Sequence, residues 1–428
     1  VSDLIADPAD AQRLYCALVT QSGSGSAAAG VFRSDDGGLL WQPVNNNINA
    51  SLLAGARRIR LGIYLSPFII LPPRTRPEIL FASVEDFKKD AQGNPLHAVF
   101  RSANQGTTWA SMGAPPYTLD SHGNLTTFDN LETLAADPSQ IDTVFVGGDD
   151  VNTVGPVYRG AYSQSTGVTT WTKVWGDGAN TTDPHADGRS LQFLGGNLVR
   201  TDDGGIYQLS NPDLSTRTWS CLNGNLRDTE FYSVAYDSLS NEVIGGAQDN
   251  GTSEQTAAGS FTWRTTLGGD GAVVQVDDTR ATQSYRYFAY YFMGGFFRRS
   301  YDASGNPGAT ENIGLILDGT GGQALPQVEK NADGSTRMLF TNPYLIDAAN
   351  PEQMIIGSQD GLFESFDHGQ HVTTLGGLNL VSGRYVPAHP LGNTTALAYG
   401  GFHFFNFGPP LGRILVADPD MLYVCLLY

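Results

Sequence analysis

The stretch Ser34-Asp35-Asp36-Gly37-Gly38-Leu39-Leu40-Trp41 decides how this chain folds. It follows Gly30-Val31-Phe32-Arg33, an apolar run typical of the end of a β-strand. The Asp36 side chain can accept backbone N–H bonds inside a tight turn, and Gly38 suits a position with positive φ. Trp41 then begins the returning strand. The stretch therefore predicts a β-hairpin closed by a Ser-x-Asp-x-Gly turn.

The same pattern recurs along the chain. Val99-Phe100-Arg101 precedes Ser102-Ala103-Asn104-Gln105-Gly106-Thr107-Thr108-Trp109, in which Asn104 replaces the Asp. Residues 200–207 form a degenerate third copy, and residues 363–369 form a fourth copy without the Trp. Repeats with a period of tens of residues are typical of solenoids and propellers, so the repeats predict a chain built from many similar hairpins.

A second repeated sequence pattern marks the repeating structural units of the chain. It consists of a short apolar strand, a turn that usually contains Asp-Pro or Asn-Pro, and another apolar strand, and its copies begin at Leu4, Leu134, Val234, Leu345 and Val416. Intervals of about 40–70 residues are typical of four-stranded propeller blades. We therefore expect an all-β fold, a single β-propeller domain over residues 1–428 with seven antiparallel blades, or eight. The expected blades are 1–50, 56–112, 130–176, 184–225, 229–267, 270–318 and 336–380, with 390–428 closing the ring or starting an eighth.

These motifs resemble Asp-boxes, also called BNR repeats, which sit on propeller blades of sialidases, sortilin-type receptors and xyloglucanases. The segments 229–236, 244–252 and 268–271, together with 185–187 and 202–207, resemble secreted bacterial propellers related to xyloglucanases and sortilin. The resemblance implies a propeller that acts on carbohydrate. Xyloglucanases place an Asp from each of two propellers across a cleft, whereas this chain is expected to hold one propeller, so the resemblance assigns no catalytic pair.

The amino-acid composition disfavours some classes of binding partner. The 428 residues include 43 Asp and Glu against 25 Lys and Arg, a formal net charge of −18, and this acidic balance disfavours nucleic acid as a partner. No apolar segment reaches the roughly 18 residues needed to span a membrane. We expect a secreted protein, extracellular or periplasmic, whose partner is a polysaccharide or another glycan, with a protein partner as the alternative.

Acidic residues recur at one position of the predicted blades, just after the second strand. Asp149, Asp203, Asp249 and Asp360 occupy this position in their repeats. Equivalent positions in a propeller lie at one height around its axis, so these carboxylates are candidates for the catalytic groups of a glycoside hydrolase, which uses a pair of them. The alternative is that each Asp only caps a tight turn before Gly.

Further residues extend this candidate site. Gathered carboxylates also favour a bound cation, so Asp150, Asp249 and Asp270 are candidate ligands of a calcium ion, the one cofactor that we consider. The polar loop 176–189 and the residues beside it supply candidate substrate-binding groups, which are Trp175, His185, Asp187, Arg189 and Asp270.

The function therefore keeps three alternatives. The first is a glycoside hydrolase-like protein with paired Asp carboxylates at one mouth of the channel. The second is a non-catalytic propeller that binds glycan or protein, as a sortilin-like interaction scaffold does. The third is a sialidase-like protein, for which Arg60, Arg189, Arg298 and Arg299 are available but the Arg-Ile-Pro signature is missing. Paired carboxyls in an open groove would favour an enzyme, and acids engaged only in turns would favour a scaffold.

Overall fold

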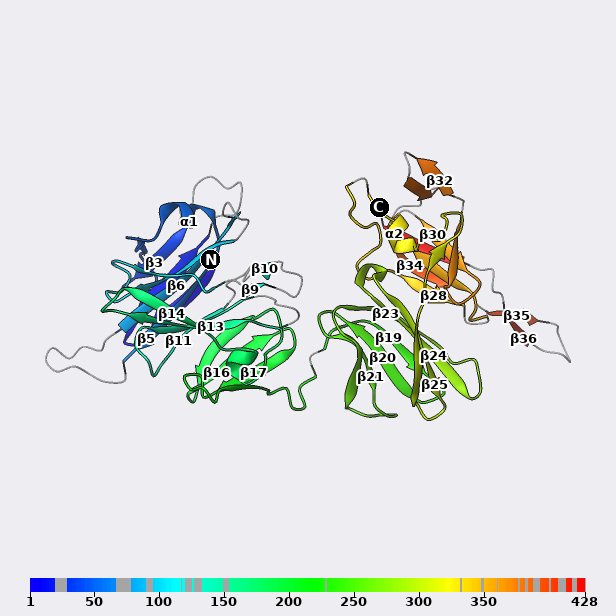
Figure 1. Ribbon diagram of the computed structural model, residues 1–428, viewed down its shortest axis with the longest axis horizontal. Helices are drawn as coiled ribbons and strands as arrows, with labels where there is room; N and C mark the ends of the chain where they lie inside the picture. The colour runs from blue at the N-terminus through cyan, green and yellow to red at the C-terminus, as the bar shows by residue number, and fades with distance from the viewer. Residues whose placement is uncertain are drawn as a thin grey trace. The chain divides into compact units, whose positions relative to one another are not determined.

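The computed structural model of the chain divides into two compact units, Val1–Asp228 and Thr229–Tyr428. It describes residues 1–19, 29–66, 78–89, 95–116, 118–119, 125–126, 133–148, 154–227, 229–331, 333–347, 350–359, 361–375, 378–381, 384–387, 393–399, 402–406, 413–417 and 422–427. Figure 1 labels the strands and helices of the two units.

The first unit holds four sheets of four antiparallel strands, and in each sheet the strands follow one another in chain order (Figure 1). The sheets are β1 (Asp3–Asp7), β2 (Asp10–Leu18), β3 (Gly30–Ser34) and β4 (Gln42–Pro43); β5 (Ala56–Leu65), β6 (Glu78–Lys89), β7 (Pro95–Ser102) and β8 (Ala110–Gly113); β11 (Thr133–Ala136), β12 (Thr143–Gly147), β13 (Val157–Ser163) and β14 (Val168–Lys173); and β15 (Ser190–Leu194), β16 (Asn197–Asp202), β17 (Gly205–Ser210) and β18 (Thr218–Cys221). Such up-and-down sheets are the blades of a propeller.

The second unit continues the pattern with three blades. They are β19 (Phe231–Asp237), β20 (Glu242–Ala247), β21 (Gly251–Gln255) and β22 (Trp263–Leu267); β23 (Gly271–Asp277), β24 (Gln283–Tyr290), β25 (Phe296–Asp302) and β26 (Pro307–Asn312); and β28 (Tyr344–Ile346), β29 (Met354–Gly357), β30 (Leu362–Ser365) and β31 (His371–Thr374). β27 (Ile316–Leu317) adds to the last blade, parallel to β31. The prediction of an all-β fold with seven blades is thus confirmed by the described residues. The prediction of a single domain stays a prediction.

The remaining elements are short. The remaining strands are β9 (Thr118–Leu119) with β10 (Leu125–Thr126), β32 (Leu378–Val381) with β33 (Arg384–Pro387), β34 (Asn393–Tyr399) with β37 (Leu422–Leu427), and β35 (Phe402–Asn406) with β36 (Arg413–Ala417). The helices are α1 (Ala50–Gly55), α2 (Leu325–Val328) and the 3₁₀ turns η1 (Asp177–Ala179) and η2 (Tyr291–Met293). Among the described residues no helix combines the length and the apolar character that crossing a membrane requires.

The Ser-x-Asp-x-Gly motif closes three hairpins with the same hydrogen bonds. In the β3–β4 turn the Ser34 hydroxyl donates to Asp36 at 2.7 Å, and Asp36 accepts the backbone N–H of Leu40 at 2.9 Å. The Ser102 hydroxyl donates to Asn104 at 2.8 Å, and the Ser365 hydroxyl donates to Asp367 at 3.0 Å, so the later turns repeat this geometry. The degenerate copy at 200–207 lies elsewhere, in the turn between the second and third strands of its blade.

Tryptophans join the blades of the first unit in sequence. Each indole N–H donates to a backbone carbonyl at the outer strand of the preceding blade: Trp109 to Val44 at 2.7 Å, Trp171 to Met112 at 3.2 Å, and Trp219 to Val174 at 2.8 Å. Because Trp109 and Trp219 are also buried, these bridges lie within the apolar packing between blades.

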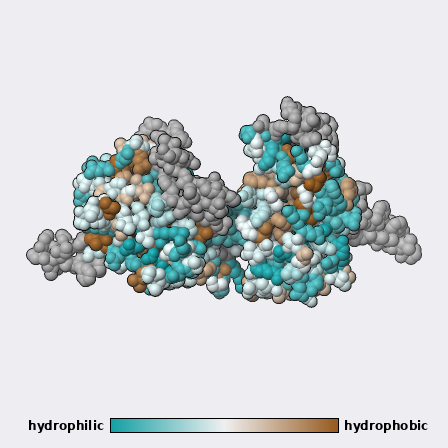
Figure 2. Space-filling model, in the orientation of Figure 1, coloured by the Kyte–Doolittle hydropathy of each residue, from teal (hydrophilic) through white to brown (hydrophobic). Residues whose placement is uncertain are grey.

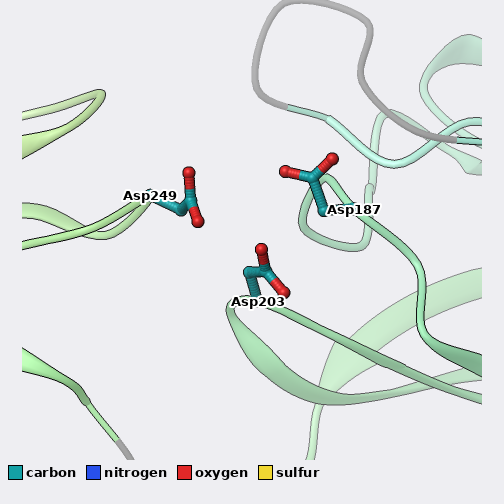
Figure 3. Close-up of side chains that lie close together, drawn as sticks. All are labelled: Asp187, Asp203 and Asp249. Atoms are coloured by element: carbon teal, nitrogen blue, oxygen red, sulfur yellow. The ribbon is translucent and has the colours of Figure 1, made fainter.

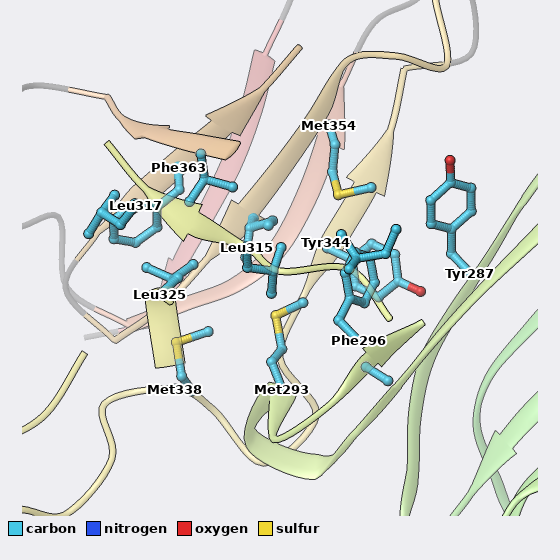
Figure 4. Packing of buried hydrophobic residues seen from close by; sticks show 14 of the residues in the cluster. Tyr287, Met293, Phe296, Leu315, Leu317, Leu325, Met338, Tyr344, Met354 and Phe363 are labelled. Carbon is cyan, nitrogen blue, oxygen red and sulfur yellow. The ribbon is translucent and has the colours of Figure 1, made fainter. Parts of the chain in front are cut away.

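The apolar core lies between adjacent blades. The largest cluster of the second unit packs Phe296 and Tyr287 of one blade against Tyr344, Met354 and Phe363 of the next (Figure 4). On the outside, the face of the molecule in Figure 2 carries mostly hydrophilic residues with scattered hydrophobic ones. The blades therefore bury their faces against one another and place their turns in solvent, where functional side chains can be presented.

Candidate functional site

The turn that joins β16 to β17 presents Asp203. Asp202 and Gly205 are the last paired residues of the two strands, so Asp203 and Gly204 alone form the turn. A Cβ atom on Gly204 would lie only 2.5 Å from the Cβ of His185, which explains why the smallest residue follows Asp203. The loop that carries His185 is thereby packed directly against the turn.

Arg189 fixes the Asp203 carboxylate. Its Nε and Nη2 atoms donate to the two carboxylate oxygens at 2.8 and 2.7 Å, the bidentate geometry that a guanidinium group favours. The Asp203 side chain is 19% exposed and that of Arg189 is 60% exposed. The pair therefore lies at the protein surface with one carboxylate held in a defined orientation.

Asp187 brings a second carboxylate to this place. It lies in the loop before β15 at a positive φ of 58°, and one of its carboxylate oxygens is within 4.8 Å of an oxygen of Asp203. Figure 3 shows the two side chains on their neighbouring loops. The chain runs from Asp187 through Gly188 and Arg189 into β15, which pairs with β16, so the strand register places both acids at the same end of the blade.

A buried ion pair supports the turn from behind. The Arg200 Nε donates to Asp202 at 3.2 Å, and neither side chain is exposed. Arg200 also donates to the His185 carbonyl at 3.1 Å. Burial raises the pKa of the Asp202 carboxyl to about 7, although the charge of Arg200 acts in the opposite direction. Asp202 is thus a supporting residue, and Asp203 is the acid that solvent can reach.

We call Asp187 and Asp203 the acid pair. A groove of about 490 Å³ inside the first unit lies next to it. The innermost strands of its blades, β1, β5, β11 and β15, form the walls. Most lining side chains are apolar, and the polar ones are Asp3, Arg60, Thr133, Arg189, Ser190 and Gln192. Because Arg189 both lines the groove and holds Asp203, the acid pair stands at one end of a concave surface, the usual setting of a ligand site.

Asp249 occupies the equivalent turn in the second unit, as predicted. It is the middle residue of the turn between β20 and β21, at a positive φ of 56° (Figure 3). Its backbone N–H donates to the Asp270 carboxylate at 2.9 Å, which ties the turn to the loop entering the next blade. The structure therefore brings Asp249 and Asp270 together, with one Asp270 oxygen engaged in a turn bond.

Aromatic rings lie next to Asp249 and Asp270. Partial burial and the charges of Asp270 and Asp249 raise the pKa of Tyr232. The Tyr232 ring meets Phe340 edge-on at 6.0 Å, and Phe340 stacks on Tyr291 at 5.4 Å. All three residues are at least 36% exposed, so solvent reaches this group of rings. We call Tyr232, Tyr291 and Phe340 the aromatic platform.

The other predicted residues have different settings. Trp175 is buried, with the Lys173 ammonium 3.9 Å from its ring centroid, so packing accounts for its position. Its predicted part in substrate binding stays a prediction, as does that of His185, whose carbonyl supports Arg200. Asp149, Asp150 and Asp360 lie outside the described residues.

Sequence reasoning missed two members of these surfaces. Gln192 lines the groove, and Phe340 completes the aromatic platform from the irregular segment before β28. A period-2 signal was available for the platform's strand, because Tyr232, Val234 and Tyr236 alternate along β19 and are all exposed. No local pattern pointed to Phe340.

The chain is similar to known proteins in its structure alone. No protein-family model matches the chain, and no curated protein matches it. Among solved structures, an ancestral GH74 enzyme matches with a TM-score of 0.50 and 14% identity, covering 98% of this chain and 72% of that one. The GH74 xyloglucanase from Xanthomonas campestris matches with a TM-score of 0.33 and 14% identity over 87% of this chain, and the tricorn protease with 0.29 and 12% over 98%.

These likenesses bear on the fold alone. The chain spans 54% of the Xanthomonas enzyme and 34% of the tricorn protease, and at these TM-scores neither match supports an argument. The ancestral GH74 enzyme supports the propeller architecture that the sheets already show.

Proposed function

We propose that this chain is a carbohydrate-binding propeller whose first unit binds a glycan in the groove between its innermost strands. The observation that carries the proposal is the joining of the groove to the acid pair through Arg189, which lines the groove and holds Asp203 bidentately. Glycans present many hydroxyl groups on partly apolar rings. A groove lined by both polar and apolar side chains, with Gln192 and Arg60 among the polar ones, complements both features.

The aromatic platform supports the same class of ligand. Sugar rings stack on flat side chains, and Tyr232, Tyr291 and Phe340 expose such surfaces beside two carboxylates that can accept hydroxyl hydrogen bonds. The platform is a second sugar-binding surface in this proposal. A secreted or extracellular location, where polysaccharides are found, belongs to the same proposal.

Hydrolysis is the second candidate function, and the spacing of Asp187 and Asp203 favours it. Their nearest oxygens lie within 4.8 Å, and retaining glycosidases hold their two carboxyl groups about 5 Å apart. Arg189 holds the Asp203 carboxylate in a fixed orientation, which suits attack on the sugar or stabilisation of positive charge on it. Asp187 would then carry the proton to the leaving oxygen.

A binding and activity screen tests the proposal. The full chain is applied to an array of plant, microbial and animal glycans, and each glycan bound is then assayed for release of reducing ends. We expect Asp203→Asn to weaken binding, and both Asp203→Asn and Asp187→Asn to abolish any release. Asp177→Asn is the matched control, because Asp177 lies in the same region but its side chain is 82% exposed and paired with Lys173.

The outcomes separate the alternatives. Binding without release in the parent chain would leave a glycan-binding protein and exclude the hydrolase. Release confined to terminal sialic acid would favour the sialidase-like alternative. Binding of no glycan at all would contradict the proposal and favour a scaffold that binds protein.

A further inference from the structure

A single buried guanidinium group lies behind both members of the acid pair. Arg200 is fully buried, and its Nε and Nη2 atoms donate to the Asp202 carboxylate at 3.2 Å and to the His185 carbonyl at 3.1 Å. Asp202 directly precedes Asp203, and His185 lies two residues before Asp187. The turn and the loop that present the two acids are therefore fastened to the same side chain.

The same guanidinium group reaches the preceding blade. Nη1 of Arg200 donates to the Pro156 carbonyl and Nη2 donates to the Gly148 carbonyl, both at 3.5 Å. Gly148 directly follows β12 and Pro156 directly precedes β13, so both carbonyls belong to the blade of β11–β14. The Gly155 N–H also donates to the Pro184 carbonyl at 3.2 Å, which ties that blade to the loop. The loop and the turn are thus both held against a neighbouring sheet.

Three glycines leave the space that the guanidinium group of Arg200 fills. A Cβ atom on Gly155 would lie 2.2 Å from Nη2, one on Gly188 would lie 2.8 Å from Cζ, and one on Gly147 would lie 3.1 Å from Nη1. A side chain at Gly155 or Gly188 would therefore displace the group. Because Gly188 directly follows Asp187, the backbone on both sides of this acid lies against Arg200.

We propose that Arg200 is the positioning residue of the acid pair, and that it sets the separation of Asp187 and Asp203 by holding the backbone segments that carry them. This inference rests on the proposed function of the pair and names a buried residue on which that function depends. Carboxyl pairs act on a sugar at a defined spacing, and the nearest oxygens here lie within 4.8 Å. A lysine would keep the charge of Arg200, but its compact ammonium group lacks the planar fork that reaches several partners.

Hydrogen exchange tests whether Arg200 holds both segments. Backbone amide exchange of the full chain is followed by mass spectrometry in the parent, in Arg200→Lys and in Gly188→Ala, which keeps the arginine but displaces its guanidinium group. We expect the peptides that contain Asp187 and Asp203 to exchange ~10-fold or more faster in both variants, because exchange reports local opening.

Two variants of the second unit are the matched controls. Arg286→Lys changes another fully buried arginine, and Gly268→Ala adds a Cβ atom that would meet no described atom within 4 Å. Both should leave the exchange of the two peptides as it is in the parent.

Glycan affinity tests the consequence for function. Cellohexaose, xylohexaose, mannohexaose and chitohexaose are titrated into the same chains well below their melting temperatures, and each mixture is assayed for release of reducing ends. A misplacement of 1 Å can cost ~100-fold in rate, so we expect Arg200→Lys and Gly188→Ala to lower the affinity, and kcat where release occurs, by ~10-fold or more. A merely structural role would leave these values unchanged in any variant that stays folded.

The results separate this inference from the proposed function. Unchanged exchange in either peptide of Arg200→Lys would overturn the inference, even if the parent binds a glycan. Faster exchange with parent-like affinity and kcat would also overturn it, because the acid pair would then tolerate the movement. Should Arg200→Lys fail to fold, Gly188→Ala decides both measurements. If the parent binds neither these hexasaccharides nor any glycan of the array, the proposed function is wrong and the inference falls with it.

Discussion

At the scale of single residues, Arg286 in β24 is one of the largest fully buried side chains that the structure describes. It is fully buried and donates to three carboxylates of the neighbouring blade, Asp237 at 3.1 Å, Glu242 at 2.6 Å and Glu254 at 2.7 Å. The Tyr301 ring lies 3.8 Å from its Cζ atom. One guanidinium group therefore neutralises acids from β19, β20 and β21 and fastens two blades together.

We expect Arg286→Met to lower the free energy of unfolding of the second unit by about 3–5 kcal/mol or more, because it leaves buried carboxylates without their cation. Urea unfolding followed by tryptophan fluorescence measures the change. Arg299→Met on the adjacent strand is the control, since Arg299 donates to the exposed Thr310 hydroxyl and to none of these buried carboxylates, and about 0.5 kcal/mol is expected there. Equal losses in the two variants would contradict this account.

The predicted calcium site is also a matter of single residues. If Asp249 and Asp270 hold the ion, excess calcium should raise the melting temperature and EDTA should lower it, by mass action on the folded state. Asp270→Asn should abolish the difference, whereas Asp302→Asn, at an exposed turn of the same unit, should keep it. Identical melting curves in calcium and EDTA would show that these acids serve their turns alone.

At the scale of elements, the tryptophan bridges connect consecutive blades of the first unit. Trp109 is 3% exposed and donates to the preceding blade, whereas Trp41, in the first blade, is 37% exposed and donates to Gly38 of its own turn. The same motif position thus has two environments. The difference follows from whether a blade precedes it within the unit.

We therefore expect Trp109→Ala to destabilise the first unit by roughly 3–5 kcal/mol, through lost packing and the unpaired Val44 carbonyl. Trp41→Ala should cost clearly less, because its ring is partly in solvent already. Differential scanning calorimetry of both variants provides the comparison. A larger loss at Trp41 than at Trp109 would refute the bridging role.

Local chemistry explains how much of this the sequence could predict. The Ser34-x-Asp36-x-Gly38 turn and the turns that carry Asp203 and Asp249 follow from residues close together in the chain, and they were predictable. The burial of Arg286 was not, because its partners Asp237 and Glu254 lie in another blade. A lone Arg60 on a strand likewise gives no local sign that it lines a groove. Long-range pairing decides these positions, and no period in the sequence encodes it.

At the scale of the whole molecule, buried carboxyls set the pH dependence of stability. Burial raises the pKa of Asp202 to about 7, and burial together with the charge of Asp7 raises the pKa of Glu78. Burial alone would raise the pKa of Glu254 too, but hydrogen bonds from Tyr301 and Arg264 outweigh burial, and the pKa of Glu254 is lowered. Asp202 and Glu78 therefore stabilise the folded state most at low pH, whereas Glu254 stabilises it most at higher pH.

The direction in which stability changes with pH follows from the number of protons that the folded and unfolded states bind. Where the pKa is raised, the folded state binds more protons than the unfolded state, so stability falls as pH rises from about 4 toward 7. Where it is lowered, stability is lost as pH falls below about 4.5. We expect maximal stability at mildly acidic pH, measured as the urea midpoint across pH 3–9 in Asp202→Asn, Glu78→Gln and the parent chain. Both variants should flatten the decline toward neutral pH, and an unchanged profile in both would disprove the assignment.

The tryptophan bridges have a consequence for how such a chain can grow. Each bridge ends on a main-chain carbonyl, which every residue possesses, so the acceptor side needs no particular side chain. A duplicated blade brings its own indole donor and finds an acceptor on whatever sequence precedes it. A blade added by recombination between gene segments can therefore form this hydrogen bond with whatever residue precedes it, whereas the apolar side chains at the new junction still have to fit one another.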